Sequence, residues 1–443
     1  MKIVVILFEG LASLLLLQSL AALAATARFV QYALRYPQRQ PKGGRAYQPK
    51  AAIFVPCKGL DPEFEKNLQP LFEQDYPDYE LVFVTESTTD PAHAILTRMI
   101  QESTRSAWLL VAGQARIRGQ KIHNLCAAIE MIDATDRRTE VFVFADADAR
   151  PGKDWLAELV APLGDKRVGA TTGFRWFLPT AAAGSWKERA AQAVVVTLLS
   201  IWNSAALSLL GERSRFAWGG SMAIRRENFE RLEIRRRWER ALSDDYMLTG
   251  AIHEARQRIR FVPAALLPSA ARLSWGELLE FTTRQIRITR IYSPSVWKVG
   301  LISHGFFVWT FWGGVSLLGL LGSAESRSLP LLLALLYLLA GLTGWSRALL
   351  AQWLLSRASG KGTVPHSQIS WVVTVAHGIL SPVISVLYLF NFLRSRQTRR
   401  IVWRGIDYEM ISPSETIVHH RPSPAPLREV SAPLSRPHSR GGG

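Results

Sequence analysis

The chain has 443 residues, 48% of them apolar, and a formal net charge of +17; this composition excludes a disordered protein and allows one catalytic domain with accessory segments. The positive charge does not indicate nucleic-acid binding, because basic residues interleaved with stacking aromatic residues are not seen. The two cysteines, Cys57 and Cys126, give no disulfide framework and suit a reducing compartment.

The chain begins with a long apolar stretch over residues 3–25. This stretch is longer than the apolar core of a usual signal peptide, so we expect a retained transmembrane anchor over 1–27, although the small residues of "LAATA" would also suit cleavage. The flank 28–50 carries several Arg and Lys residues and no acid. The positive-inside rule therefore places this flank, and the domain that follows it, in the cytosol.

Residues 50–275 alternate short β-rich runs with helical patterns, which is typical of βαβ units on a parallel sheet. They predict a Rossmann-like α/β domain inserted between N-terminal and C-terminal membrane helices. Ligands of such sheets bind where the strands end, and the polar stretches "PCKG", "TESTTD" and "DADAR" stand at three such ends. The absence of G-x-G-x-x-G and Walker sequences argues against a dinucleotide dehydrogenase or a P-loop enzyme. Strands are expected at 51–57, 79–87, 107–113 and 140–148.

Residues 188–211 form a further apolar stretch inside this domain. A single crossing here would put Asp148 and Asp245 on opposite sides of the membrane. If one active site uses both residues, the stretch either lies in the membrane interface or re-enters it. An ordinary buried helix is the other interpretation.

An amphipathic interfacial helix with an R-x-x-R motif is expected over 276–298, and C-terminal membrane segments over 299–393. Three crossings starting from the cytosol would place the basic stretch "RSRQTRRIVWRG" outside, against the charge rule. One apolar segment should therefore not cross, and the last, which contains Pro382, could re-enter as a hairpin. Residues 394–443 are expected to be a basic, largely disordered tail.

Two aspartates separated by one residue, Asp146 and Asp148, follow the fourth expected strand. Paired carboxylates there can bind a divalent cation, although solvated acids at strand ends are common. Downstream, "LSDDYMLTG" has two acids at the start of a helical pattern: Asp244 could be an N-cap, and Asp245 a catalytic base. Arg284 and Arg287 share one helical face, where they could hold a diphosphate or simply form a basic interfacial surface.

Several motifs in order resemble the ceramide glucosyltransferases and their bacterial relatives, glycosyltransferase family 21. The resemblance covers residues 50 to about 410 and implies a GT-A fold and metal-dependent, inverting transfer from a UDP-sugar, UDP-glucose or UDP-N-acetylglucosamine, to a membrane lipid alcohol. It also implies a bacterial inner-membrane location with a cytosolic catalytic domain. The motifs are "CKGLDPEFEKNLQPLF", "GQKIHNLCAAIE", "DADARPGKDWL", "GATTGFRWF", "WGGSMAIRRENFE", "LSDDYMLTG" and "IVWRGIDYEM".

Carried over to this sequence, the resemblance makes Asp146 and Asp148 the ligands of Mn²⁺ or Mg²⁺ and of the diphosphate, and Asp245 the base. Arg284 and Arg287 match the (R/Q)-x-x-R-W signature, in which Ile288 replaces the Trp. The expected donor-site residues are Lys58, Glu86, Asp90, Lys121 and Asn124, with Glu86 favoured over Asp90 for the uridine. Arg150 is expected to be a solvated turn residue without a role.

Three points stay open on the sequence alone. The acceptor could be ceramide, a diacylglycerol or a hopanoid, because an apolar acceptor surface looks alike in each case. A processive polysaccharide synthase shares the motif plan, although the chain has few membrane segments for a polymer channel. A non-catalytic membrane scaffold is the third interpretation, and the retention of both metal-pair acids, the base and both arginines argues against it.

Overall fold

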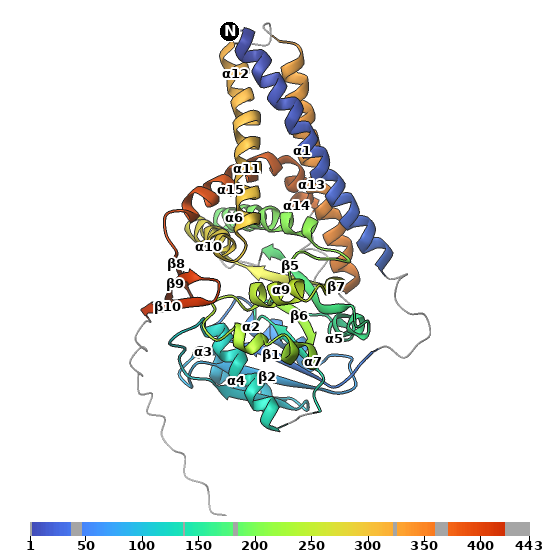
Figure 1. Cartoon of the computed structure of the whole chain (residues 1–443), viewed down its shortest axis with the longest axis vertical. Helices are drawn as coiled ribbons and strands as arrows, with labels where there is room; N and C mark the ends of the chain where they lie inside the picture. The colour runs from blue at the N-terminus through green and yellow to red at the C-terminus, as the bar shows by residue number, and fades with distance from the viewer. Residues whose placement is uncertain are drawn as a thin grey trace, which may run out of the picture.

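The computed structural model describes residues 2–36, 47–135, 138–179, 185–321, 326–358 and 371–420. An α/β domain occupies one end of the molecule, and long helices from both halves of the chain project from it (Figure 1). The predicted arrangement, an α/β domain inserted between N-terminal and C-terminal apolar helices, is confirmed.

The central sheet has seven strands in the order β3-β2-β1-β4-β6-β5-β7. Its first four strands are parallel, as the βαβ pattern predicts. The sheet beyond them is mixed, because β6 runs antiparallel to both β4 and β5. The strands are β1 Ala51–Pro56, β2 Tyr79–Thr85, β3 Ala107–Val111, β4 Val141–Ala145, β5 Val168–Pro179, β6 Ser221–Arg225 and β7 Arg258–Ala271.

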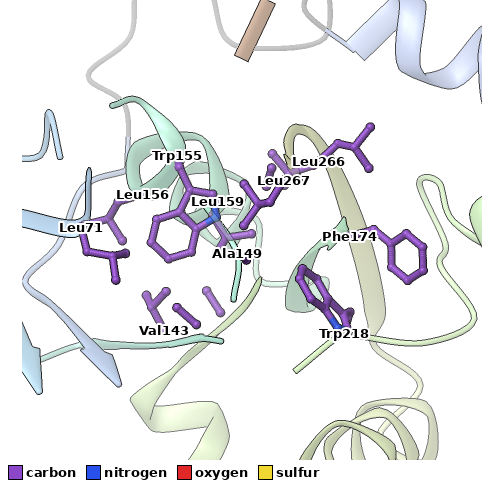
Figure 2. Packing of buried hydrophobic residues seen from close by; sticks show 14 of the residues in the cluster. Leu71, Val143, Ala149, Trp155, Leu156, Leu159, Phe174, Trp218, Leu266 and Leu267 are labelled. Atoms are coloured by element: carbon purple, nitrogen blue, oxygen red, sulfur yellow. The ribbon is translucent and has the colours of Figure 1, made fainter. Parts of the chain in front are cut away.

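Helices cover both faces of this sheet, so its central strands are apolar on both sides. In β1, Ile53 and Val55 belong to one buried cluster, and Ala52 and Phe54 belong to another. In the first cluster the Trp155 ring lies among aliphatic side chains (Figure 2), and its Nε1 donates to Ser221 Oγ at 2.9 Å. The helices of this domain are α2 Phe64–Phe72, α3 Pro91–Glu102, α4 Gln120–Thr135, α5 Trp155–Val160, α7 Arg226–Arg231, α8 Ile234–Arg237 and α9 Asp244–Glu254.

Helix α1, Lys2–Arg35, is joined to the α/β domain at its carboxyl end. The Tyr32 hydroxyl donates to Phe261 O at 2.6 Å, and Phe29 and Tyr36 are part of the main buried cluster. The opposite end of α1 runs beside α12 and α13, away from the domain (Figure 1). Within the described residues, four helical segments are long and apolar enough to cross a membrane: Lys2–Arg35, Trp186–Leu209, Pro294–Leu320 and Ser328–Arg357.

Helix α6, Trp186–Ser204, is the apolar stretch whose position the sequence left open. It packs against β5 and against the helices α10, α14 and α15. In its most apolar window 56% of the residues are buried, against 17% for α1. Asp148 and Asp245 lie in one domain, so α6 does not separate them. A buried helix at the base of the long helices (Figure 1) is the better description.

The expected interfacial helix over 276–298 is divided in two. Helix α10, Trp275–Tyr292, begins with a capping box at Ser274 and ends at Ser293. Helix α11 then begins at Pro294, where proline's missing N–H costs no hydrogen bond. The chain continues through a π-helical turn into α12 and α13. These elements are α11 Pro294–Phe307, the turn Val308–Trp312, α12 Gly313–Leu321 and α13 Ser328–Ala358.

The last apolar segment consists of α14, Trp371–Ile379, and α15, Ser381–Ser395, which are bent by 68° relative to each other. The pair packs against α13 and α6, near the base of the long helices (Figure 1). Pro382 lies in the first turn of α15. This shape fits the re-entrant hairpin that the charge rule suggested.

The expected tail over 394–443 is wrong for residues 400–420, which form a three-stranded antiparallel sheet. The physical reason is the alternation of its apolar residues: Ile406, Tyr408 and Met410 are buried on one face, where they pack with Leu242 and Ile288. The tail residues 421–443 lie outside the described residues. The strands are β8 Arg400–Trp403, β9 Ile406–Ser412 and β10 Glu415–His420.

Candidate active site

A cleft of about 440 Å³ lies at the carboxyl ends of β1 and β4. It is bounded by α4, by the carboxyl end of β7, by α10 and by the turn between β8 and β9. Among the described residues, its lining does not include Glu86, Asp90, Asp245 or Arg287. The predicted site residues that line it are Lys58, Lys121, Asn124, Asp146, Asp148 and Arg284.

Lys121 is the centre of a buried charge cluster in this cleft. Its Nζ lies 2.9 Å from Asp146 Oδ1 and 3.2 Å from Asp244 Oδ2, and it donates to Gly219 O at 3.1 Å. Burial acts to lower the pKa of Lys121, but the neighbouring carboxylates outweigh it and raise the pKa. For Asp146, burial acts in the raising direction, yet Lys121 and Arg175 hold its pKa below the ordinary value. Asp146 is therefore ionised and positioned before any ligand binds.

The glycines of "WGGS" allow the loop before β6 to approach this cluster. A Cβ atom on Gly219 would lie 2.5 Å from Asp244 Oδ2 and 2.8 Å from Lys121 Nζ. A Cβ atom on Gly220 would lie 2.5 Å from Asp146 Oδ2. A side chain at either position would have to displace these charged groups, so the loop backbone itself forms one wall of the charge cluster.

Asp148 has one carboxylate oxygen with a partner and one without. Its Oδ2 pairs with Arg175 Nη1 at 3.2 Å, while the buried Oδ1 accepts no hydrogen bond. Burial raises the pKa of Asp148 to about 6, and Arg175 only partly opposes the shift. An unpartnered buried carboxylate oxygen beside a second carboxylate is suited to a cation.

The residues present fit a divalent cation of the Mg²⁺ or Mn²⁺ type. No group of three or more His, Cys, Asp or Glu residues that could hold a metal occurs in the part of the chain that the structure describes. A site of one or two carboxylates, completed by substrate phosphates and water, is the usual form for Mg²⁺. Asp146 and Asp148 would be the protein ligands.

The two acids of "LSDDY" have different surroundings, and the expected N-cap role of Asp244 is wrong. Ser243 is the N-cap residue of α9, and Asp244 is its first helical residue, 3% exposed and paired with Lys121. The carboxylate of Asp245 accepts hydrogen bonds from the Gly219 and Tyr246 amides and from the Ser243 hydroxyl. Burial raises the pKa of Asp244 to about 6.

The acids after β2 make structural contacts. Glu86 pairs with Lys58 at 2.6 Å, so the two expected donor-site residues lie together at the ends of β2 and β1. Asp90 is the N-cap of α3: its carboxylate accepts from Ala92 N at 2.9 Å and from Gly59 N at 2.9 Å. Asp90 therefore holds the loop after β1 in place through backbone amides.

Only one of the two arginines of the R-x-x-R motif lines the cleft. Arg284 lines the cleft and lies over the Phe281 ring, and burial lowers its pKa to about 10. Arg287 lines a different cavity and donates to Arg400 O at 2.7 Å. Ile288, where the motif has Trp, is 8% exposed and packs in the cluster beneath the small sheet. Only Arg284 is in position to contact a ligand in the cleft.

Sequence reasoning missed Arg404, which lies at the turn between β8 and β9. Arg404 and Gly405 both have positive φ, 52° and 77°, and the turn directs the arginine into the cleft. Its Nη2 lies 2.5 Å from Asp61 Oδ1. The "RG" dipeptide between two alternating apolar runs in "IVWRGIDYEM" is a hairpin signal that could have placed it.

Sequence reasoning also missed Arg175, and its expectation that Arg150 is a solvated turn residue is wrong. Arg175, on β5, lines the cleft, pairs with Asp148 and lies over the rings of Phe177 and Trp218. Arg150 is not solvated, because its guanidinium pairs with Glu63 at 2.5 Å and its side chain is 16% exposed. It fixes the end of "DADAR" to the segment before α2.

The other end of the cleft is apolar. Phe177 on β5, Leu199 on α6, Leu273 before α10 and Phe281 on α10 line it. They belong to, or pack against, a buried cluster that includes residues of α15. The cleft thus leads from the charge cluster toward the apolar helices.

Comparison with known proteins gives a family match over most of the chain. The family model of glycosyl transferase family 21 matches residues 14–415. A ceramide glucosyltransferase from Komagataella phaffii (strain GS115 / ATCC 20864) is 42% identical over 50 residues, which cover 11% of this chain and 10% of that relative.

Two solved structures are more distantly similar. The mannosyltransferase PcManGT from Pyrobaculum calidifontis, in complex with GDP-Man and Mn²⁺, is 19% identical with a TM-score of 0.44, covering 87% of this chain and 98% of that one. GalNAc-T7 with UDP, GalNAc and Mn²⁺ is 13% identical with a TM-score of 0.35, covering 55% and 48%.

Proposed function

The chain belongs to glycosyl transferase family 21 and is a glycosyltransferase with a GT-A class α/β domain, and on this basis we propose that it glycosylates a membrane lipid. The donor is a UDP-sugar, UDP-glucose or UDP-N-acetylglucosamine, and the acceptor is a lipid hydroxyl such as that of ceramide or a hopanoid. The product is a glycolipid with inverted anomeric configuration.

One observation carries this proposal: a single cleft joins a charged end to an apolar end. The charged end contains Lys121, Asp146 and Asp148 at the carboxyl ends of the strands, where α/β sheets bind nucleotides. The apolar end opens toward α6 and α10, beside helices that could cross a membrane. This arrangement suits a polar donor and an apolar acceptor that meet in the middle.

At the charged end, the donor diphosphate lies between the carboxylate pair and the basic residues. Asp146 and Asp148 would hold a divalent cation, which when bound would supply positive charge against the leaving diphosphate. Arg284 and Arg404 approach from α10 and from the turn between β8 and β9, and they hold the phosphate oxygens by charge-assisted hydrogen bonds. Lys121, in the first turn of α4, keeps Asp146 ionised and oriented.

The transfer needs one base. The acceptor oxygen attacks the anomeric carbon, the bond from that carbon to the diphosphate breaks, and UDP leaves with the electron pair. We assign the base to Asp245, which lies just outside the cleft lining and is joined through Gly219 to Lys121 at the charged end; it accepts the proton of the acceptor hydroxyl. Its carboxylate is oriented for this by the Gly219 and Tyr246 amides, whereas Asp244 is bound to Lys121. No covalent glycosyl-enzyme is required for inversion.

Two long-range contacts support a membrane arrangement. Arg404 pairs with Asp61, and Gln120 N donates to the Tyr408 hydroxyl at 3.1 Å. The small sheet and the α/β domain therefore lie on the same side of the membrane. This requires an even number of crossings between the domain and the small sheet, so we assign crossings to the segments Pro294–Leu320 and Ser328–Arg357 and none to the bent pair. Helix α1 is assigned one crossing because it is long and apolar. The basic flanks support a cytosolic domain.

The test is to incubate the purified full-length protein with a panel of UDP-sugars and a total lipid extract, and to identify new glycolipids by mass spectrometry. We expect one lipid class to gain one hexose or N-acetylhexosamine, and Asp245→Asn to form none. A ladder of products with increasing sugar number would support a processive synthase instead. Equal background hydrolysis by both proteins, without transfer, would contradict the proposal.

A further inference from the structure

A second cavity, of about 470 Å³, lies between α10, the end of α15 and the small sheet. It shares Arg284 and Glu280 with the catalytic cleft. The residues that line only this second cavity have no role in the proposed transfer. Its basic side chains are Arg284, Arg287, Arg394 and Arg400, and its acidic ones are Glu280 and Asp407.

The arginines of this cavity are bound mostly to neutral groups. Arg287 donates to Arg400 O at 2.7 Å, and Arg394 donates to Gln397 Oε1 at 2.8 Å. Arg400 pairs with a carboxylate, that of Glu409, at 3.4 Å. Burial, together with the charges of Arg290 and Arg394, lowers the pKa of Arg287. Several guanidinium groups that repel one another therefore line this cavity.

Further arginines extend this charge. The segment that joins α15 to β8 also contains Arg396 and Arg399, and no acid occurs between residues 394 and 406. Burial lowers the pKa of Arg290 on α10, and the nearby Arg399 and Arg396 add to the effect. Such a concentration of positive charge is compensated by an anion in solution or at a surface.

Exposed apolar side chains border the same cavity. Phe390 and Leu393 on α15 are 42% and 50% exposed, and Val402 on β8 is 50% exposed. Phe390 and Val402 are part of the lining itself. Helix α15 belongs to the bent apolar pair at the base of the long helices (Figure 1). Basic groups directly beside exposed apolar groups match a lipid with a charged headgroup and apolar chains.

We propose that this cavity binds an anionic phospholipid of the membrane, with its phosphate between Arg287, Arg394 and Arg400 and its acyl chains along Phe390 and Leu393. The occupant is a lipid rather than free phosphate because the apolar border would otherwise face water. This site adjoins the catalytic cleft, with which it shares Arg284 and Glu280, but Arg287, Arg394 and Arg400 lie outside that cleft, and the proposal stands whatever sugar and lipid the enzyme uses.

The test uses the full-length protein in lipid nanodiscs that contain equal amounts of phosphatidylglycerol and phosphatidylcholine. After release into the gas phase, native mass spectrometry counts the lipids of each kind that the protein retains. We expect phosphatidylglycerol to be retained preferentially. Arg394→Gln should reduce that preference about fivefold, the factor expected for one arginine at an anionic surface.

Arg394 is the suitable position because its hydrogen bond goes to a neighbouring side chain, whereas Arg287 and Arg400 also support the small sheet. The matched control is Arg236→Gln, on an α8 arginine that is 77% exposed and lies in the α/β domain. This control should leave lipid retention unchanged. Arg394→Lys should restore most of the preference, since it returns the charge.

Three results would overturn the proposal. Equal retention of both phospholipids by the wild type would show no anionic preference. A loss of the same size in Arg236→Gln would show that net charge alone is responsible. Displacement of phosphatidylglycerol by inorganic phosphate at equal concentration would assign the cavity to a free anion. If Arg394→Gln does not fold, salt dependence of retention by the wild type tests the same claim, because retention that salt does not weaken contradicts a charged site.

Discussion

Arg404 and Asp61 form an ion pair, with 2.5 Å between Nη2 and Oδ1, that joins the turn between β8 and β9 to the loop after β1, 343 residues earlier. Burial would lower the pKa of Arg404, but Asp61, Asp148 and Asp146 raise it. The guanidinium is therefore charged, and it lies near both proposed metal ligands. A strand pair at the end of the chain thus completes a site built by the first half of the domain.

Arg404→Gln should weaken donor binding. Loss of a hydrogen bond to a charged group costs about 1.5–3 kcal/mol, which corresponds to an increase of about 10- to 150-fold in the KM for the UDP-sugar. Arg404→Lys should recover part of this, because it keeps the charge without the planar fork. Steady-state kinetics with varied donor measures both. An unchanged KM in Arg404→Gln would remove Arg404 from the donor site.

Asp148→Ala should abolish the metal-dependent part of UDP binding, because it removes the unpartnered carboxylate oxygen of the proposed cation site. Titration of the purified protein with UDP, with and without Mn²⁺, measures the effect. Asp154→Ala is a matched control, since Asp154 is a nearby exposed acid whose side chain does not cap α5. Undiminished affinity in the presence of metal would show that the cation is held elsewhere.

Asp245→Asn should lower kcat by about 100- to 10,000-fold, the range for loss of a general base. The amide keeps the volume of the carboxylate and can still accept from the Gly219 or Tyr246 amide, so UDP affinity should remain within about twofold. Asp244→Asn should instead act through Lys121 and Asp146 and change the donor KM. If only Asp244→Asn abolished turnover while UDP still bound, the base would be Asp244.

Asp244 also gives a prediction about pH. Because burial raises its pKa from 3.8 to about 6, the folded protein binds more protons than the unfolded chain between these values, and stability falls as the pH rises through this window. Asp244→Asn removes the titrating carboxyl and with it this loss of stability. Its thermal unfolding midpoint in detergent should exceed that of the wild type at pH 7.5, and the difference should shrink at pH 4.5. A difference that grows toward acid pH would contradict the assignment.

The membrane arrangement can be tested by cysteine labelling. Cys57 and Cys126 are both about 1% exposed, so the natural protein should react little with a membrane-impermeant maleimide. Ser328→Cys, at the start of α13, and Ser414→Cys, in the small sheet, are at exposed positions on opposite sides of the proposed membrane. In intact cells only the first should react, and in inside-out vesicles only the second. Reaction of both from one side would disprove the three-crossing arrangement.

The βαβ part of the domain could be predicted because its signals are local. Each strand is a short continuous apolar run, and each run ends in polar residues that lie at one edge of the sheet. This places Lys58, Asp146 and Asp148 in one cleft without any knowledge of long-range contacts. The antiparallel β6 could not be foreseen in the same way, since strand direction depends on the path of the chain between strands.

Other parts depended on contacts between distant segments. The small sheet buries one face against α9 and α10, and its short strands, which follow a basic segment, resemble a tail when read alone. Arg284 and Arg287 share a helical face and both line the second cavity, but only Arg284 also lines the cleft. Asp244 and Asp245 differ because Lys121, more than 120 residues earlier, forms an ion pair with Asp244. Spacing alone carries none of this information.

The attachment of α1 has a practical consequence. Phe29, Tyr32 and Tyr36 belong to the same buried cluster as strands of the central sheet. Removing residues 1–36, that is all of α1 and Tyr36, would therefore leave a hole in the domain and an exposed apolar patch. Attempts to produce the domain without α1 should yield aggregates, and enzymes built in this way cannot become soluble by shedding their first helix.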